Sequence, residues 1–160
     1  MTSILKVNQI QTTAGAVPTA ADLGLNVTGN VLQVLQSAGA GSQNISSTSF
    51  VDIGLSVNIT PRDANSKFLV QGAMDVDIDA NEQTFFTVFR DSTDLGSTNG
   101  LLNTWNGTNR MIVPSTVLVL DSPSTASAIT YKIRIKNAAG TIRLNSQGCK
   151  IIMTVSEIAG

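Results

Sequence analysis

Three aspartates alternate along one predicted strand and could offer oxygen ligands to a metal ion. Asp75, Asp77 and Asp79 lie two residues apart, and Glu82 follows closely. Carboxylate oxygens are the ligands that calcium prefers, but the segment lacks the glycine-turned loop of a dedicated calcium motif. Carboxylates that alternate with apolar residues are also typical of an exposed strand face. We therefore expect no bound metal and no cofactor, and the three aspartates remain the calcium candidates.

A second group of residues could recognise a sugar. The segment 99–111 (NGLLNTWNGTNRM) holds the only tryptophan, Trp105, together with Asn106, Asn109 and Arg110. An indole that stacks on a sugar ring, beside amides that bind its hydroxyl groups, would suit receptor binding. Alternatively, Trp105 plugs the end of the folded domain or a seam between subunits. We favour this plug because a single large aromatic side chain usually finds shelter.

The residue types missing from the chain exclude much catalytic chemistry. The sequence has no histidine, and Cys149 is its only cysteine. The commonest general base and transition-metal ligand is therefore absent, and no internal disulfide can form. Alternation in CKIIMTVSEI places Cys149 on one strand face with Ile151, Met153 and Val155, which predicts a packed core thiol. No carboxylate pair lies in a setting typical of hydrolases, so we expect no catalytic residues and no enzymatic activity.

Charge is sparse throughout the chain. The net charge is −1, and charged residues make up 13% of the 160 residues. Such a chain offers no basic surface to phosphate backbones or to anionic lipid, so we expect neither nucleic acid nor membrane as a partner. No run reaches the roughly 18 apolar residues of a membrane span, and the start lacks the pattern of an export signal. We expect a soluble protein.

The elements that would position these residues are strands, because apolar and polar residues alternate with period two. The clearest cases are 51–59, 68–79 and 129–136, and turn sequences such as Asn99-Gly100 separate them from less regular apolar runs. Pro114 indicates an edge strand, a bulge or a break. No helical periodicity extends beyond a few residues. The pattern predicts an all-β fold, an antiparallel β-sandwich of the jelly-roll type, preceded by an extended N-terminal arm.

The first 49 residues carry only two charged side chains, Lys6 and Asp22. Residues 1–30 are too polar to form a core, yet they lack the high net charge of disordered tails. They form either a weakly ordered terminus or a docking arm. We predict an attachment arm at 1–30 and a jelly-roll domain at 31–160, with 37–49 as a long loop rather than a hinge. The predicted contact residues of the arm are Ile4, Val7, Ile10, Leu23 and Leu25.

Several segments resemble bacteriophage tail-fibre and virion structural proteins, notably those of marine and cyanobacterial phages. The opening ILKVNQIQTTAG, followed by PTAADLGLN and VLQVLQ, is similar to the start of such proteins. Proteins of the same group also contain segments similar to SFVDIGLSVNITPRDANSKFLVQGAMDV, FFTVFRDSTDLG and ITYKIRIKNAAG. The resemblance covers nearly the whole chain. It implies a phage virion protein, but related modules occur on tail fibres, baseplates and capsids.

The strand order also resembles the trimeric jelly rolls of the tumour necrosis factor and complement C1q type. This resemblance implies a homotrimer in which the final apolar strand lies near the centre, with Ile151, Met153 and Val155 as trimer-core candidates. A low aromatic content of 4% is compatible with burial across subunit contacts. A monomeric sandwich could have the same composition.

These observations favour a nonenzymatic virion structural protein, a short trimeric fibre that its N-terminal arm anchors to the phage particle. Its expected partners are two further copies of itself, a tail, baseplate or capsid protein bound through the arm, and a host surface glycan at Trp105. One alternative is a capsid decoration, cement or head-fibre protein, since the chain lacks a long shaft. Another is a stand-alone carbohydrate-binding module. We expect the protein to assemble in the bacterial cytoplasm and to reside on the virion surface.

Overall fold

The computed structural model describes residues 11, 14–15, 17–18, 23, 27–39 and 41–160. Regular structure in this part of the chain consists of strands, and no helix there is long and apolar enough to cross a membrane. The strands are β1 (Val31–Gly39), β2 (Gln43–Ile45), β3 (Val51–Ile59), β4 (Lys67–Ile78), β5 (Glu82–Arg90), β6 (Thr93–Asp94), β7 (Leu102–Asn106), β8 (Met111–Asp121), β9 (Ile129–Asn137), β10 (Ile142–Leu144) and β11 (Ile151–Ile158).

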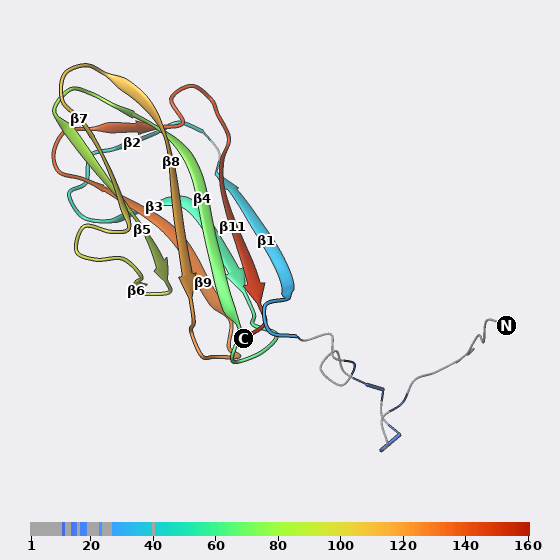
Figure 1. The fold of residues 1–160 in the computed structure, drawn as a ribbon. Helices are drawn as coiled ribbons and strands as arrows, with labels where there is room; N and C mark the ends of the chain where they lie inside the picture. Colours follow the sequence, from blue (N-terminus) through green and yellow to red (C-terminus); the bar gives the residue numbers. More distant parts are fainter. Residues whose placement is uncertain (1–10, 12–13, 16, 19–22, 24–26, 40) are drawn as a thin grey trace.

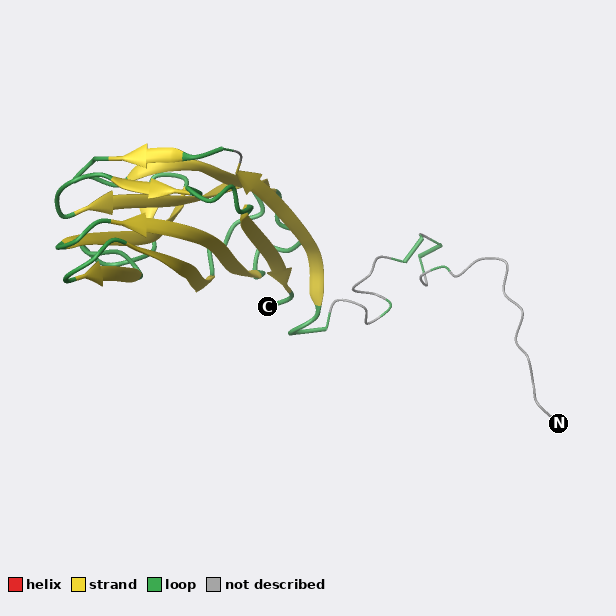
Figure 2. Ribbon diagram, turned by 90° about the horizontal axis from the view of Figure 1, so that it is seen from above, coloured by secondary structure: helices red, strands yellow, loops and turns green. Residues whose placement is uncertain are grey.

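The strands form two antiparallel sheets that pack face to face (Figures 1 and 2). Sheet A has the order β1-β11-β4-β10-β2, with β8 on the other side of β4. Sheet B has the order β3-β9-β5-β6, and β7 also pairs with β5. The long pairs are nested: β1 with β11, β3 with β9, β4 with β8, and β5 with β7. This arrangement confirms the predicted antiparallel sandwich and is the strand order of a jelly roll.

The core lies between the sheets because one face of each long strand is apolar. On β3 the residues Ile53, Leu55, Val57 and Ile59 are at most 5% exposed, while the alternate residues are exposed. The alternation predicted for 68–79 and 129–136 likewise places Val70, Val76, Ile133 and Ile135 in the core. Period-two patterning therefore sets which side chains each sheet buries.

The chain enters and leaves the sandwich at the same end, called here the proximal end. Gly29 N–H donates to the Ala159 carbonyl at 2.9 Å, and Ala159 N–H donates to the Asn30 carbonyl at 2.8 Å. Nearby, the buried Glu157 carboxylate accepts from Arg62 N–H at 2.6 Å and so ties the β3–β4 turn to β11. The opposite, distal end carries the loops 79–81, 107–110 and 138–141. The 12 residues of β4 run between the ends, about 40 Å at 3.3 Å per residue.

Three local predictions have definite outcomes. Cys149 is exposed, so its assignment to the core is wrong; the strand begins only at Ile151, and the segment before it is not part of the ladder. Pro114 lies inside an unbroken β8, which pairs with β4 and forms an edge of sheet A in the described structure. The segment 37–49 contains the end of β1 and the short strand β2.

Candidate functional site

The acidic row at the distal end of β4 is neutralised by arginines. The Asp77 side chain is fully buried, and Arg110 binds both of its oxygens: Nε donates to Oδ1 at 2.8 Å, and Nη2 donates to Oδ2. Arg143 Nη1 lies 3.7 Å from Asp77 Oδ1, and its Nη2 donates to Asp79 Oδ2 at 3.2 Å. The hydrogen bonds from Arg110 hold the pKa of Asp77 below its ordinary value, against the opposing effect of burial.

The calcium candidates do not assemble into a site. Asp77 is enclosed by guanidinium groups, and Asp79, whose side chain is 45% exposed, is bound to Arg143. Both carboxylate oxygens of Asp75 are buried without a hydrogen-bond partner in the described structure. Within the described residues no three acidic or cysteine side chains converge as metal ligands. The predicted exposed strand face is also wrong for Asp77, since its arginine partners cover it.

Glu82 joins two distal loops. Its carboxylate accepts from Asp79 N–H at 3.2 Å and from Thr141 N–H at 3.0 Å. Gly140 has a φ of 68°, and a Cβ there would lie 1.7 Å from Glu82 Oε1. The close approach of this carboxylate therefore requires glycine at position 140. Glu82 serves the loop architecture rather than a metal.

Trp105 is exposed in the predicted recognition segment. It lies on β7 opposite Gln83 and is 64% exposed, so it does not plug the end of this sandwich. The alternation along β7 turns Thr104 and Asn106 toward the interior and leaves Trp105 on the outer side. Gly107 packs against the indole, where a Cβ would lie 2.7 Å from the ring. The indole thus presents an open flat surface near the distal end.

The other recognition candidates have different roles. Asn106 is buried, and its Nδ2 donates to the carbonyls of Asp79, at 3.3 Å, and Asn109. Its amide holds the β7–β8 loop together and is not free to bind a ligand. Asn109 is exposed, and Arg110 is engaged by Asp77 although its side chain is 56% exposed. The structure therefore leaves Trp105 and Asn109 as the accessible members of this group.

The arm candidates lie largely beyond what the structure describes. Ile4, Val7, Ile10 and Leu25 are outside the described residues. Leu23 is described and is 47% exposed.

The trimer-core candidates lie inside the sandwich of a single chain. Ile151, Met153 and Val155 are each 0% exposed, because they face the core from β11. The opposite side of the same strand carries Ile152 and Thr154, which are partly exposed. A contact between subunits on this strand would therefore use this outer side and not the three buried residues.

The outer side of sheet A is a surface that the sequence analysis did not single out. Its central cross-strand rows contain no charged side chain. This uncharged face consists of Thr116, Leu118 and Leu120 on β8, Leu69, Gln71 and Ala73 on β4, Ile152, Thr154 and Ser156 on β11, and Val34, Gln36 and Ala38 on β1. A signal was present in the sequence, because VLVL (117–120) is apolar at successive positions and so predicts a strand with two apolar sides.

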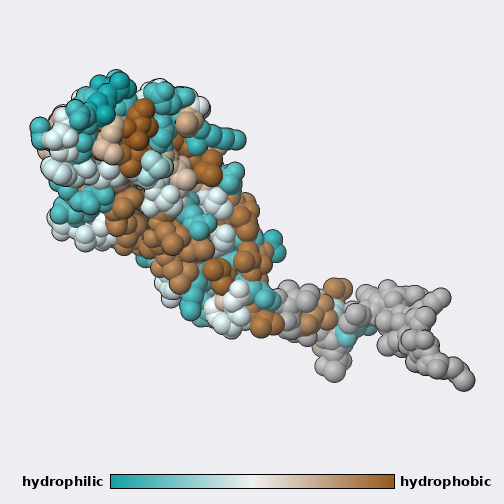
Figure 3. Space-filling view, turned by 45° about the horizontal axis from the view of Figure 1, so that its top comes forward, coloured by the Kyte–Doolittle hydropathy of each residue, from teal (hydrophilic) through white to brown (hydrophobic). Residues whose placement is uncertain are grey.

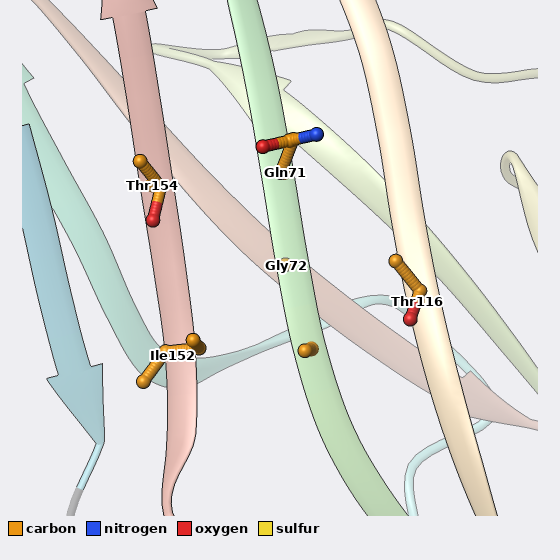
Figure 4. Close-up of a pocket in the computed structure, with 6 residues that line it drawn as sticks. Gln71, Gly72, Thr116, Ile152 and Thr154 are labelled. Atoms are coloured by element: carbon orange, nitrogen blue, oxygen red, sulfur yellow. The ribbon is translucent and has the colours of Figure 1, made fainter. Parts of the chain in front are cut away.

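A hollow of about 230 Å³ lies at the centre of the uncharged face. Figure 4 shows Thr116 on one side of β4, and Ile152 and Thr154 on the other. Ala73 forms the floor of the hollow, because its side chain is smaller than those of the residues that flank it. In Figure 3, apolar side chains gather along the middle of the body.

No family model matches this chain. No curated protein is similar to it either. Solved structures from infectious bursal disease virus show a distant likeness. The Gt-strain structure covers 82% of this chain with 11% identity and a TM-score of 0.46, and the Gx-strain structure covers 79% with 11% identity and a TM-score of 0.44. The structure of the VP2 subviral particle covers 80% of this chain with 11% identity and a TM-score of 0.41.

This chain spans just over a third of those chains, 36% to 38% of their length. The likeness concerns the arrangement of strands alone. That the chain is a phage tail-fibre protein, as the resemblance of its sequence implies, remains a prediction.

Proposed function

We propose that this chain is a nonenzymatic structural protein of a phage particle, a short trimeric fibre whose N-terminal arm attaches it and whose distal end faces outward. One observation carries the proposal. The chain enters the sandwich at Gly29, at the proximal end, whereas the exposed Trp105 lies near the distal end, about 40 Å away along β4. Attachment and display therefore occupy opposite ends.

The polar groups of the body support a structural role. The arginines at the distal end bind Asp77 and Asp79, and Glu82 and Glu157 accept backbone N–H groups. Each of these charges already has a partner that stabilises a loop or a turn. The sequence resemblance to phage virion proteins supports the same class of function.

Two other functions are alternatives to the fibre. A capsid decoration or head-fibre protein would use the same arm on a different part of the particle, and the compact body favours it. A stand-alone carbohydrate-binding module would need only Trp105 and its surroundings, and the exposure of the indole favours it. The three assignments differ in whether the protein joins particles and in where it joins them.

The test compares the full chain with a chain that begins at residue 27, each produced in phage-infected cells that lack the native protein. We expect the full chain in purified particles and the shortened chain only in the soluble fraction. The shortened chain must retain the circular dichroism of the full chain for the comparison to hold. Full-length Trp105→Ser is the matched control and should join particles normally. Incorporation of the shortened chain would contradict attachment through the arm.

A further inference from the structure

We propose that the uncharged face of sheet A is the surface through which copies of this chain pack around a common axis. The inference rests on the trimer in the proposed function and identifies the surface that forms it. It replaces Ile151, Met153 and Val155, which are buried within one chain, with the outer side of the same sheet.

The two outer faces of the sandwich differ sharply in charge. On sheet B, Asp52 binds Lys132 at 3.2 Å and Arg134 at 2.5 Å. Arg134 also lies 4.2 Å from the centroid of Phe89, so charged side chains cover an aromatic ring there. On sheet A, by contrast, Leu118 and Leu120 are each 57% exposed with no charge in their cross-strand rows. Charged side chains therefore cover the β3–β9 part of sheet B, whereas the central rows of sheet A carry none.

The β8 edge of sheet A also favours coverage by a second copy. In the described structure β8 and β1 are its long edge strands. Natural proteins usually protect such edges with lysine, other charges or bulges, because unpaired strands associate readily. From Met111 to Leu120, β8 carries no charge, and its only such feature is Pro114. Coverage by another subunit would provide the missing protection.

The size of the face suits the centre of a subunit contact. Strands rise about 3.3 Å per residue and lie about 4.8 Å apart, so the five-residue length of four strands that holds the three uncharged rows covers roughly 300 Å² before the height of the side chains is added. This area is within the range of the largest apolar patches on monomers, which often mark interfaces. It is less than half of the about 800 Å² that each partner buries in a standard interface, so the face forms the centre of the contact and the rest of the contact lies beyond the three rows.

A second copy of this chain fits the face better than a charged partner. An uncharged surface offers no ion pairs to a charged protein, whereas it meets its own copy without like-charge repulsion. The shape of the face is also complementary to that of a second copy, because Leu118 and Leu120 project from β8 beside the hollow over Ala73. Leucines of one copy can enter the hollow of the next.

The position of the arm selects a cyclic arrangement. If the axis runs along the strands, every copy presents its proximal end on the same side, and all arms reach one particle together. A two-fold axis across the strands would place the arms at opposite ends. The proposed attachment therefore requires the cyclic form, with three copies as the sequence resemblance implies.

The test measures the mass of the full chain in solution at micromolar concentration by sedimentation velocity. We expect a trimer for the unsubstituted protein and a monomer for Leu118→Glu, with Leu120→Lys as a second variant. Both leucines are more than half exposed in one chain, so thermal unfolding should remain cooperative. The matched control is Trp105→Glu, which alters a residue that is 64% exposed outside the face and should leave the trimer intact.

Oxidative cross-linking gives an independent readout. In a Cys149→Ser background, Thr116→Cys on the uncharged face should form a disulfide between chains, and Ser56→Cys on the outer side of sheet B should not. A folded Leu118→Glu that remains a trimer would overturn the proposal, as would loss of the trimer in Trp105→Glu. If the unsubstituted protein is a monomer and still joins particles through its arm, the uncharged face is not a contact between subunits, whereas the proposed attachment through the arm stands.

Discussion

At the residue scale, the distal end is organised by the buried Asp77 carboxylate. Arg110 donates two hydrogen bonds to it, and Arg143 lies beside it. These groups join the end of β4 to the start of β8 and to β10, so they hold the loops that surround Trp105. A carboxylate that loses its charge in this setting also loses the interaction that offsets its burial.

Asp77→Asn should therefore lower stability in a pH-dependent way. The native pKa of Asp77 lies below its ordinary value near 4, so its contribution is fully present above pH 4 and is lost as the pH falls through the lowered pKa. We expect a loss of about 1–3 kcal/mol at pH 7 that shrinks below pH 4. Urea unfolding from pH 2 to 7 measures it.

The control is Asp79→Asn, whose side chain is 45% exposed and which should cost less than about 1 kcal/mol. A deficit in Asp77→Asn that stays constant across the pH range would show that the charge of Asp77 is not what stabilises the fold.

Trp105 gives the second prediction at this scale. If the distal end contacts a host glycan, Trp105→Ala should reduce binding of the full chain to purified host surface polysaccharide at least tenfold, because an exposed indole is a stacking surface for sugar rings. Isothermal titration measures the affinity. Met111→Ala, which alters an exposed residue at the start of β8, is the control and should bind normally. Equal binding by Trp105→Ala would remove the indole from recognition.

These residues also mark the limit of sequence reasoning. The segment around Trp105 could be chosen from its composition, but the buried role of Asn106 could not, since its three carbonyl partners are brought together only by the turn geometry. Cys149 was misplaced because alternation was extended past the first residue of β11. The pairing of Asp77 with Arg110 joins residues 33 positions apart and has no local signal.

At the element scale, the long strands were predictable because their apolar positions alternate without interruption. The same reasoning missed β7, whose sequence LNTWN has little apolar character and is ordered by pairing with β5. It also chose as trimer-core candidates the residues on the side of β11 that faces the core of a single chain. Alternation defines two faces of a strand, but it does not tell which face the second sheet covers.

Packing between the sheets gives a prediction on β4 and β9. Gly72 faces the core, where a Cβ would lie 2.1 Å from Ile133 Cδ1. Gly72→Ala should therefore cost about 1–3 kcal/mol through overpacking. Ile133→Val removes that Cδ1 and should itself cost about 0.5–1.5 kcal/mol.

The double variant should lose less than the sum of the two single changes, as measured by denaturant unfolding. Strict additivity would mean that the close contact is relieved elsewhere and that Gly72 is not needed for the sheets to meet.

At the scale of the whole molecule, the proposed function rests on the separation of two ends and two faces. The chain enters at the proximal end, the accessible indole lies near the distal end, charges cover the β3–β9 part of sheet B, and the central rows of sheet A carry no charge on their outer side. This combination suits a module that is attached at one end and associates laterally with its own copies. Composition alone pointed away from catalysis and from nucleic acid, but the distribution of charge between the faces required the fold.

Electron cryomicroscopy of particles purified from phage-infected cells that produce the protein tests the central claim most directly. We predict trimeric density on the particle surface, with the proximal ends toward the particle, the uncharged faces of sheet A toward the common axis and the Trp105 loops outermost. Its location on tail, baseplate or capsid would also decide between a fibre and a decoration protein. Particles without the protein, or density with the distal end toward the particle, would contradict the account.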